Sequence, residues 1–119
     1  MLNLDTHVLI FAFTGQLRAR EKALLSKESW GISAIVLWEI AKLFELGRIV
    51  VDLEAPEVMR SLSLVHVWPI DILLCQQLRR LDFEGDPADE LIAATSLLYR
   101  VPLVTRDGAI RSSRLVPLA

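Results

Sequence analysis

The sequence predicts an α/β fold: a three-layer α/β/α sandwich with a mostly parallel central sheet of four to five strands. Short apolar runs of strand length alternate with longer segments of helical periodicity along the 119 residues. Strands separated by helices build βαβ units, in which neighbouring strands run parallel. Hydrophobic residues make up 53% of the chain, and no linker or repeat interrupts it, so residues 1–119 are expected to form a single domain.

The first half of the chain is expected to hold two strands, four helices and a short extended piece. The strands cover 1–5 and 30–33, the helices cover 6–13, 17–27, 34–46 and 55–62, and the extended piece covers 49–51. Gly47 is the expected C-cap of the third helix. That helix is apolar almost all round, with Glu39, Lys42 and Glu45 as a narrow polar stripe. Such a helix packs on two sides, so we expect it to face a second chain as well.

The second half predicts a strand at 65–68, a helix at 71–81, a long helix at 86–99 and a strand at 103–104. A turn at 105–108 and a last edge strand at 115–116 are expected to follow. The helix at 71–81 has Asp71 as its N-cap and is expected to turn Ile72, Leu74, Cys75 and Leu78 inward. Cys75 is the only cysteine, which excludes an internal disulfide and favours a cytoplasmic setting.

Charge and hydropathy exclude two broad classes. The formal net charge of −2 and a pI of about 5.6, with ten arginines scattered along the chain, argue against a general nucleic-acid binder, so a nucleic acid would be held locally. No apolar run approaches the ~20 residues that span a bilayer, so no membrane association is expected. The first residues carry an acid, Asp5, and no basic stretch, which argues against a signal peptide.

Four acids are placed by this topology at the carboxyl edge of the sheet, where open α/β sheets bind ligands. Asp5 ends the first strand, and Asp107 follows the strand at 103–104. Asp89 lies in the first turn of the preceding helix, and Glu39 lies in the second turn of the helix after the second strand. Each acid also has an ordinary structural role open to it, as a cap, a dipole partner or a turn residue. Four such acids at one edge indicate an anionic pocket.

Clustered carboxylates repel one another unless a cation is present. Their oxygens are hard ligands that suit Mg²⁺ or Mn²⁺, whereas one cysteine and two histidines support a zinc site poorly. His7 directly follows the first acid and is placed to touch such a site, and His66 is expected as a core or edge histidine. Asp86 is expected to cap the helix that Pro87 begins. A divalent ion at this edge suits phosphodiester hydrolysis.

Four motifs carry these acids: L-x-L-D-T-H-V-L-I at 2–10, I-S-A-I-V-L-W-E-I at 32–40, D-P-A-D-E-L-I-A-A-T-S at 86–96 and L-V-T-R-D at 103–107. In order and spacing they resemble the motifs of the PIN-domain family, and within it the VapC-type toxins of prokaryotic toxin–antitoxin pairs. The resemblance spans essentially the whole chain. It implies that Asp5, Glu39, Asp89 and Asp107 form the catalytic acidic quartet and that Asp5 and Asp89 hold Mg²⁺, with Mn²⁺ as the alternative.

The resemblance further implies a Mg²⁺-dependent endoribonuclease that cleaves an RNA substrate. Its implied partners are a second copy in a homodimer and a small antitoxin that inserts a segment, often with a basic residue, at the acids. Thr6, Ser33 and Thr105 fall where the family often has small hydroxyl residues, which bond acids, water or phosphate, or serve as caps. Arg106 is a candidate for contact with the RNA backbone, with simple solvent exposure as the alternative.

One residue departs from the family pattern, and two other functions remain open. Glu90 stands where relatives of this form often have Arg, which adds negative charge near a phosphate site. One alternative is a catalytically weak PIN-fold module that binds RNA or a protein. The other is a phospho-receiver-like signalling domain, which needs an acceptor Asp after the middle strand and a late Lys. Here the third strand ends in Trp68-Pro69, and the last lysine is Lys42.

Overall fold

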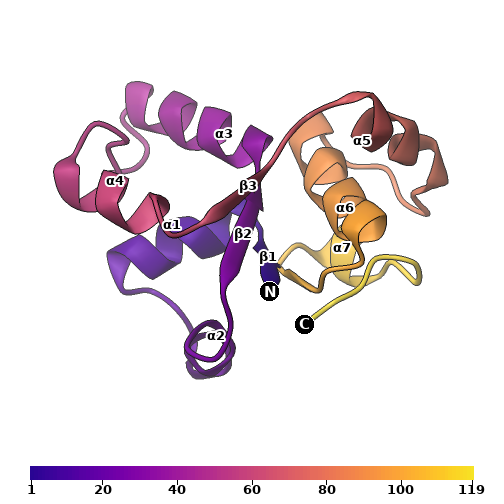
Figure 1. Ribbon diagram of the computed structural model, residues 1–119, viewed down its shortest axis with the longest axis horizontal. Coiled ribbons are helices and arrows are strands. Elements are labelled where there is room, and N and C mark those ends of the chain that lie inside the picture. The colour runs from indigo at the N-terminus through magenta and orange to yellow at the C-terminus, as the bar shows by residue number, and fades with distance from the viewer.

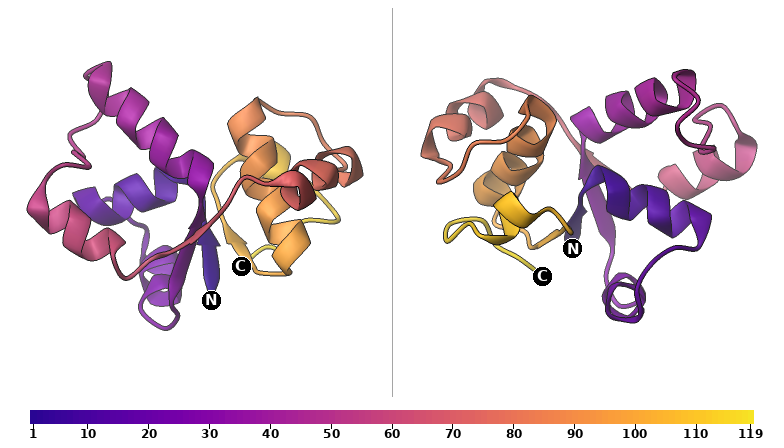
Figure 2. Two further views of the ribbon diagram at one scale, coloured as in Figure 1. Left: turned by 45° about the horizontal axis from the view of Figure 1, so that its top comes forward. Right: turned by 180° about the vertical axis from the view of Figure 1, so that it is seen from behind.

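The computed structural model describes residues 1–119, in which a sheet lies between two layers of helices (Figure 1 and Figure 2). The sheet has four strands, all parallel, in the order β3-β2-β1-β4. Helices α1 to α4 lie on one side of it and α5 to α7 on the other. In chain order the elements are β1 (Leu2–Leu4), α1 (Thr6–Thr14), α2 (Ala19–Leu25), β2 (Trp30–Ser33), α3 (Ala34–Glu45), α4 (Pro56–Leu62), β3 (His66–Trp68), α5 (Ile72–Gln77), η1 (Leu78–Arg80), α6 (Pro87–Tyr99), β4 (Leu103–Val104) and α7 (Gly108–Arg111).

Strand β1 is central, and all three of its residues are buried. Leu2 and Leu4 belong to a core cluster of 17 buried residues that fills the space between sheet and helices. Asn3 points the other way, and its Nδ2 donates to the Ile92 carbonyl at 3.1 Å and to Ser96 Oγ at 2.9 Å. These bonds tie the middle of the sheet to α6. The α/β/α fold predicted from the sequence is confirmed.

The helix signals in the sequence act at the predicted places. Ser33 accepts from the backbone N–H of Ile35 at the start of α3, and Asp71 accepts from Leu74 at the start of α5. Gly47, just after α3, adopts a left-handed conformation with φ of 71°, which glycine tolerates without strain. The residues 49–51 form no strand, although Val51 is buried in the core.

The C-terminal end differs from expectation. The residues 115–116 form no strand, and the sheet is extended instead by an isolated parallel bridge between Leu118 and Leu103. The predicted turn after β4 is the start of a short helix, α7, with Asp107 as its N-cap. A four-residue helix is too short to show a periodic apolar pattern, so it could not be predicted from periodicity.

The helix predicted at 71–81 ends earlier than expected, and two of the residues that were expected to face inward are exposed to solvent. Helix α5 ends at Gln77 and tightens into a 3₁₀ turn, so only a narrow face meets α6. Leu74 occupies that face and is fully buried, whereas Ile72 is 76% exposed. Cys75 is exposed too, so its expected burial is wrong.

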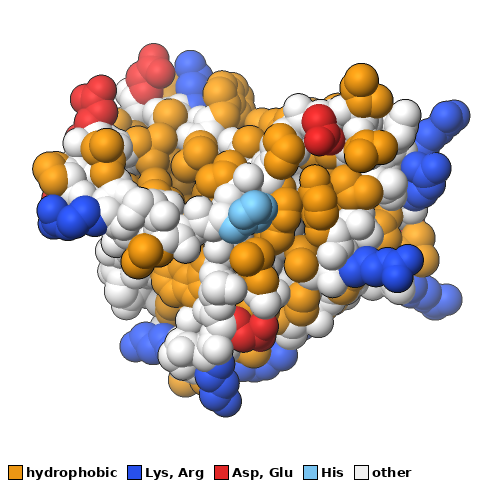
Figure 3. Space-filling view, viewed as in Figure 1, with side chains coloured by type: hydrophobic (Ala, Val, Ile, Leu, Met, Phe, Trp, Pro, Cys, Tyr) orange, Lys and Arg blue, Asp and Glu red, His pale blue; other side chains and the backbone are white.

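Helix α3 is buried on one side only. Val36 and Ile40 face the core, and the helix packs on α1, β2 and α6. Trp38 is 62% exposed and Leu46 is 55% exposed. Figure 3 shows hydrophobic side chains gathered over α3, the end of β3, α5 and α6 on this face. Contact of α3 with a second chain therefore stays a prediction.

No helix is long and apolar enough to cross a lipid bilayer.

The close approach of Trp68 to β2 requires a glycine at position 31. A Cβ built on Gly31 would lie 2.4 Å from the Trp68 ring, and that buried ring is stacked on Tyr99 at a centroid separation of 5.7 Å. We therefore expect Gly31→Ala to lower the free energy of unfolding by about 1–3 kcal/mol, measured by urea denaturation. Gly108→Ala is the matched control, because a Cβ there meets nothing within 4 Å. Equal stabilities of the two variants would contradict this packing.

Candidate active site

A cleft of about 440 Å³ opens at the carboxyl edge of the sheet, and all four predicted acids line it. They come from four separate elements: the end of β1, helix α3, the first turn of α6 and the N-cap of α7. The lining residues are Asp5, His7, Phe11, Glu39, Asp86, Asp89, Arg106 and Asp107. The topology thus brings together side chains that are far apart in the sequence, as the parallel order of the strands requires.

Asp5 is the buried acid of the cleft, with a relative exposure of 5%. Its Oδ1 accepts from the backbone N–H of Thr6 at 2.8 Å, and its Oδ2 accepts from the Thr105 hydroxyl. Its backbone N–H donates to Val104 in β4. Burial raises the pKa of this carboxyl, and the two hydrogen bonds partly offset the rise. The charge of Asp107 adds to the rise, so the two acids lie within electrostatic reach.

Glu39 enters the cleft from the second turn of α3, as predicted. Its Oε1 accepts a hydrogen bond from the hydroxyl of Thr6, the first residue of α1. Burial raises the pKa of Glu39, and the charges of Asp5 and Asp86 raise it further. Thr6 and Thr105 therefore both hold acids, whereas the third predicted hydroxyl, Ser33, serves as a helix cap.

Asp86 and Asp89 lie together at the start of α6. Asp86 caps the helix as predicted, with Oδ1 accepting from the Asp89 backbone N–H at 3.1 Å, and its side chain also lines the cleft. Burial and the neighbouring charge of Asp86 raise the pKa of Asp89 to about 7, with smaller contributions from Asp5 and Asp107. No salt bridge within the chain pairs any of the acids of this cluster.

Two hydrogen bonds, one from its backbone and one to its side chain, hold Asp107 at the start of α7. Its backbone N–H donates to Thr105 Oγ1 at 3.0 Å, and its Oδ1 accepts from Ile110 N–H at 3.0 Å. The Thr105 hydroxyl thus links Asp107 to Asp5, because it accepts from one and donates to the other. The second carboxylate oxygen of Asp107 accepts no hydrogen bond within the chain, and the residue lines the cleft.

Arg106 closes one side of the cleft, but its charge is already paired. Its Nε donates to Glu21 Oε2 at 2.8 Å and its Nη2 donates to Glu21 Oε1 at 2.7 Å, a bidentate pair. The guanidinium carbon lies 4.2 Å from the centroid of the Phe11 ring. The bond to Arg106 lowers the pKa of Glu21 to about 2. The sequence alone gave no sign of this pair, because 85 residues separate its members.

The remaining predicted residues lie at the margin of the cleft or outside it. His7 is exposed and lines the cleft, and its charge lowers the pKa of Asp5 and of Glu39. Glu90 does not line the cleft; its Oε2 accepts from Gly85 N–H at 3.4 Å. His66 lies exposed on β3, an edge strand.

The donor set of the cleft fits a hard divalent cation. No three His, Cys, Asp or Glu side chains are already grouped as a finished ligand shell. Mg²⁺ does not require one, because it usually keeps several waters and is bound through one or two carboxylates. Asp5 and Asp89 supply such oxygens, and their raised pKa values reflect the same unfavourable negative charge that a cation would relieve.

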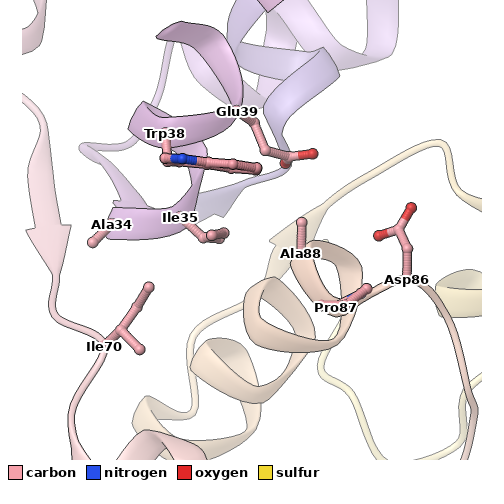
Figure 4. A pocket seen from close by; sticks show the side chains of 8 residues that line it. All are labelled: Ala34, Ile35, Trp38, Glu39, Ile70, Asp86, Pro87 and Ala88. Carbon is pink, nitrogen blue, oxygen red and sulfur yellow. The ribbon is translucent and has the colours of Figure 1, made fainter. Parts of the chain in front are cut away.

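An apolar groove of about 600 Å³ adjoins the cleft and shares Glu39 and Asp86 with it. Figure 4 shows the Trp38 indole lying along the groove above Ile35, with Ile70 on the opposite wall and the start of α6 on a third side. The remaining lining residues are Ala34, Pro87 and Ala88. The Glu39 carboxylate points away from the apolar part, so the groove leads directly to the acids.

Comparison with known proteins identifies the family. The chain belongs to the PIN-domain family, whose model, described as PIN domain, matches residues 3–113. No curated protein matches the sequence.

Solved structures are similar in fold at low identity. A toxin–antitoxin complex from Klebsiella pneumoniae matches with a TM-score of 0.74 and 20% identity, covering 100% of this chain and 97% of that one. FitAcB from Neisseria gonorrhoeae matches with a TM-score of 0.67 and 24% identity, covering 92% and 90%. VapBC2 from Rickettsia felis, bound to a DNA fragment from its promoter, matches with a TM-score of 0.68 and 16% identity, covering 100% and 98%.

The raised pKa of Asp89 predicts a pH-dependent stability of the metal-free protein. The folded state holds a proton on this carboxyl up to pH of about 7, whereas the unfolded chain releases it near 3.8. Stability therefore falls as the pH rises between these two values. Asp89→Asn keeps a donor toward Asp86 and removes the charge, so its thermal midpoint at pH 7.5 should exceed that of the wild type by a few degrees.

The measurement is the thermal midpoint in EDTA across pH 4 to 8, with Glu54→Gln as the control. Glu54 is an exposed acid outside the cleft, so its neutralisation should change neither the midpoint nor its slope with pH. A wild-type thermal midpoint that does not change with pH over this range would show that the charge of Asp89 does not destabilise the fold. An equal rise of the midpoint in Glu54→Gln would show the same.

Proposed function

We propose that this protein is a divalent-metal-dependent endoribonuclease and the toxin of a toxin–antitoxin pair. The observation that carries the proposal is the convergence of Asp5, Glu39, Asp89 and Asp107, from four elements, on one cleft in which no salt bridge pairs any of them. Membership of the PIN-domain family and the likeness in fold to toxin–antitoxin complexes support it. RNA is the proposed substrate, and Mg²⁺, with Mn²⁺ as the alternative, is the proposed cofactor.

In the proposed reaction each acid has a part set by its surroundings. Asp5 and Asp89 would hold the ion, Asp5 being fixed by Thr6 and Thr105. When bound, the ion would lower the pKa of the attacking water and offset negative charge on the phosphate. Glu39 has a raised pKa and a second oxygen, Oε2, not used by Thr6, which suits it to take a proton from that water.

The proton at Glu39 and the attack at phosphorus together account for hydrolysis. Water gives a proton to Glu39 and adds at phosphorus, and the bond from phosphorus to the leaving oxygen breaks. The leaving oxygen takes up a proton in turn, so that a phosphate monoester and a hydroxyl result and Glu39 is restored. Asp107 would orient the water or a second ion through its free carboxylate oxygen. Arg106 would act as the wall of the cleft and not as a free phosphate ligand, because Glu21 uses two of its donors.

The proposed antitoxin would occupy the apolar groove beside the acids. The groove takes apolar side chains between Trp38 and Ile70, and at its far end Glu39 and Asp86 can pair with a basic side chain. A segment bound in this way blocks the cleft and neutralises its charge. The proposed homodimer would cover further exposed apolar side chains, among them Ile72 and Leu73 of α5.

The nuclease proposal is tested by Asp5→Asn. The amide preserves the shape of the side chain: its oxygen can still accept from the Thr6 N–H, and its nitrogen can donate to the Thr105 hydroxyl oxygen. The fold should therefore be retained while the metal ligand is lost. We expect cleavage of a mixed RNA pool in Mg²⁺ to fall by about 100-fold or more, and growth inhibition in a bacterial host to disappear.

Asp71→Asn is the matched control, because it removes one carboxylate outside the cleft while Asn caps α5 equally well. Mg²⁺ should also raise the thermal midpoint of the wild type and of Asp71→Asn, but not of Asp5→Asn. Cleavage by the wild type that survives EDTA, or equal cleavage by Asp5→Asn, would show that the chain carries out different chemistry. No cleavage by the wild type would indicate a binding module.

The partner proposal is tested by Trp38→Ser. Loss of this exposed ring from the centre of the groove should weaken binding of the antitoxin by roughly 30-fold, because aromatic anchors dominate such interfaces. The antitoxin is the product of the short reading frame expected next to this gene, and binding is measured by calorimetry. Leu64→Ser, which alters a still more exposed apolar residue outside the groove, should bind normally. Equal affinities would place the antitoxin elsewhere.

A further inference from the structure

A second polar cavity lies next to the acid cleft and has the opposite charge. It has a volume of about 250 Å³ and is lined by residues of α2, of α7 and of the segment that leads from β4 to α7. Four of the ten arginines of the chain line it, against a single acid, Glu21. In a protein with a formal net charge of −2, this is a marked local excess of positive charge. The arginines are Arg18, Arg20, Arg106 and Arg111.

Three of these guanidinium groups keep most of their donors free. Arg106 is neutralised by Glu21. Arg20 gives one N–H to the Ala119 carbonyl at 3.1 Å, and Arg111 gives one to the Thr105 carbonyl at 3.2 Å. A guanidinium has five N–H donors. Arg18, Arg20 and Arg111 are all exposed, so the cavity, hereafter the arginine pocket, presents unused charged donors to solvent.

The arginine pocket is joined to the acid cleft by two residues. Arg106 lines both cavities. Thr105 lines the arginine pocket, receives Arg111 on its carbonyl, and donates its hydroxyl to Asp5. A polyanion that places one phosphate at the acids therefore passes the arginine pocket with the next part of its backbone.

We propose that the arginine pocket binds a backbone phosphate of the RNA that flanks the phosphate to be cleaved, through Arg18, Arg20 and Arg111. This inference rests on the proposed ribonuclease function. Arginine is suited to the role because its planar fork matches phosphate oxygens in a bidentate arrangement. An acidic cleft repels RNA until a cation enters it, so affinity has to come from charge placed beside the cleft.

The ion pair of Arg106 with Glu21 explains how the negatively charged acid cleft and the positively charged arginine pocket can lie side by side. Its bond to Glu21 removes the charge of both residues and leaves a neutral wall between cleft and pocket, braced by the ring of Phe11. Without that wall, a free arginine would reach the carboxylates and compete with the cation. The pocket can then hold the chain of the RNA without filling the acid cleft.

The test is RNA binding by Arg18→Ala/Arg20→Ala in an Asp5→Asn background, measured by fluorescence anisotropy with a labelled single-stranded oligonucleotide. Each phosphate contact on a single strand contributes ~0.7 to the slope of log Kd against log salt. We therefore expect the slope to fall by about 0.7 and Kd at ~0.1 M salt to rise about fivefold. Arg18→Glu alone, an exposed change with no contact to Ala119, should give a loss in the same direction.

The matched control is Arg60→Ala/Arg79→Ala, which removes the same charge from exposed positions on α4 and η1, outside the pocket. This control should keep the wild-type slope. In the active protein, Arg18→Ala/Arg20→Ala should raise KM more than it lowers kcat, and more for an oligonucleotide than for a dinucleotide, which has no flanking phosphate. Equal effects of the two double variants would overturn the proposed pocket.

The two proposals fail in different ways. If the wild type cleaves RNA and the pocket variants bind it normally, the pocket is not a phosphate site and the nuclease stands. If the wild type cleaves no RNA but the pocket variants lose affinity, the ribonuclease proposal fails and the pocket remains a polyanion site. If neither cleavage nor arginine-dependent binding is seen, both are overturned.

Discussion

The candidate site depends on the way one buried carboxylate, Asp5, is held. It lies at the end of the central strand, with its backbone bonded to β4 and its oxygens bonded to Thr6 and Thr105. A buried charge is tolerated only where hydrogen bonds or a cation compensate it. The hydroxyl of Thr105 is 100 residues away along the chain, so this compensation requires strand β4 to be paired with β1. The site and the topology are therefore one structural unit.

The acids around the cleft show how a partner decides the state of a carboxyl group. Glu21 is buried, but Arg106 holds its pKa at about 2. Asp89 has only other carboxylates near it, and its pKa rises to about 7. If stability were the only requirement, Asp89 would be expected to have a cationic partner, as Glu21 has. An unpaired cluster that opposes folding is typical of a site that works with a cation added later.

Structural features set by residues close together in the sequence could be predicted. Features set by contacts between residues far apart in the sequence could not. The caps at Asp71 and Asp86 depend on residues three positions away, and both lie where the pattern predicted them. At Ser33 a cap was one of two roles that the sequence left open, and the structure shows the cap. The order of strands and helices was enough to place four acids at one edge. The pair of Arg106 with Glu21 has no local signal, and the exposure of Cys75 follows from how α5 breaks and packs, which periodicity does not report.

The cleft has a different neighbour on each side, and this arrangement constrains how a nuclease of this shape can be controlled. The apolar groove shares Glu39 and Asp86 with the cleft, and the arginine pocket shares Arg106. A protein segment that enters from the groove reaches the acids without touching the arginines, and an RNA that enters past the arginines needs the same acids. The two ligands would then compete only at the carboxylates, so an inhibitor need not resemble RNA. On the proposed function, such an inhibitor would supply a positive charge where the metal would otherwise bind, and apolar contacts in the groove would provide its affinity.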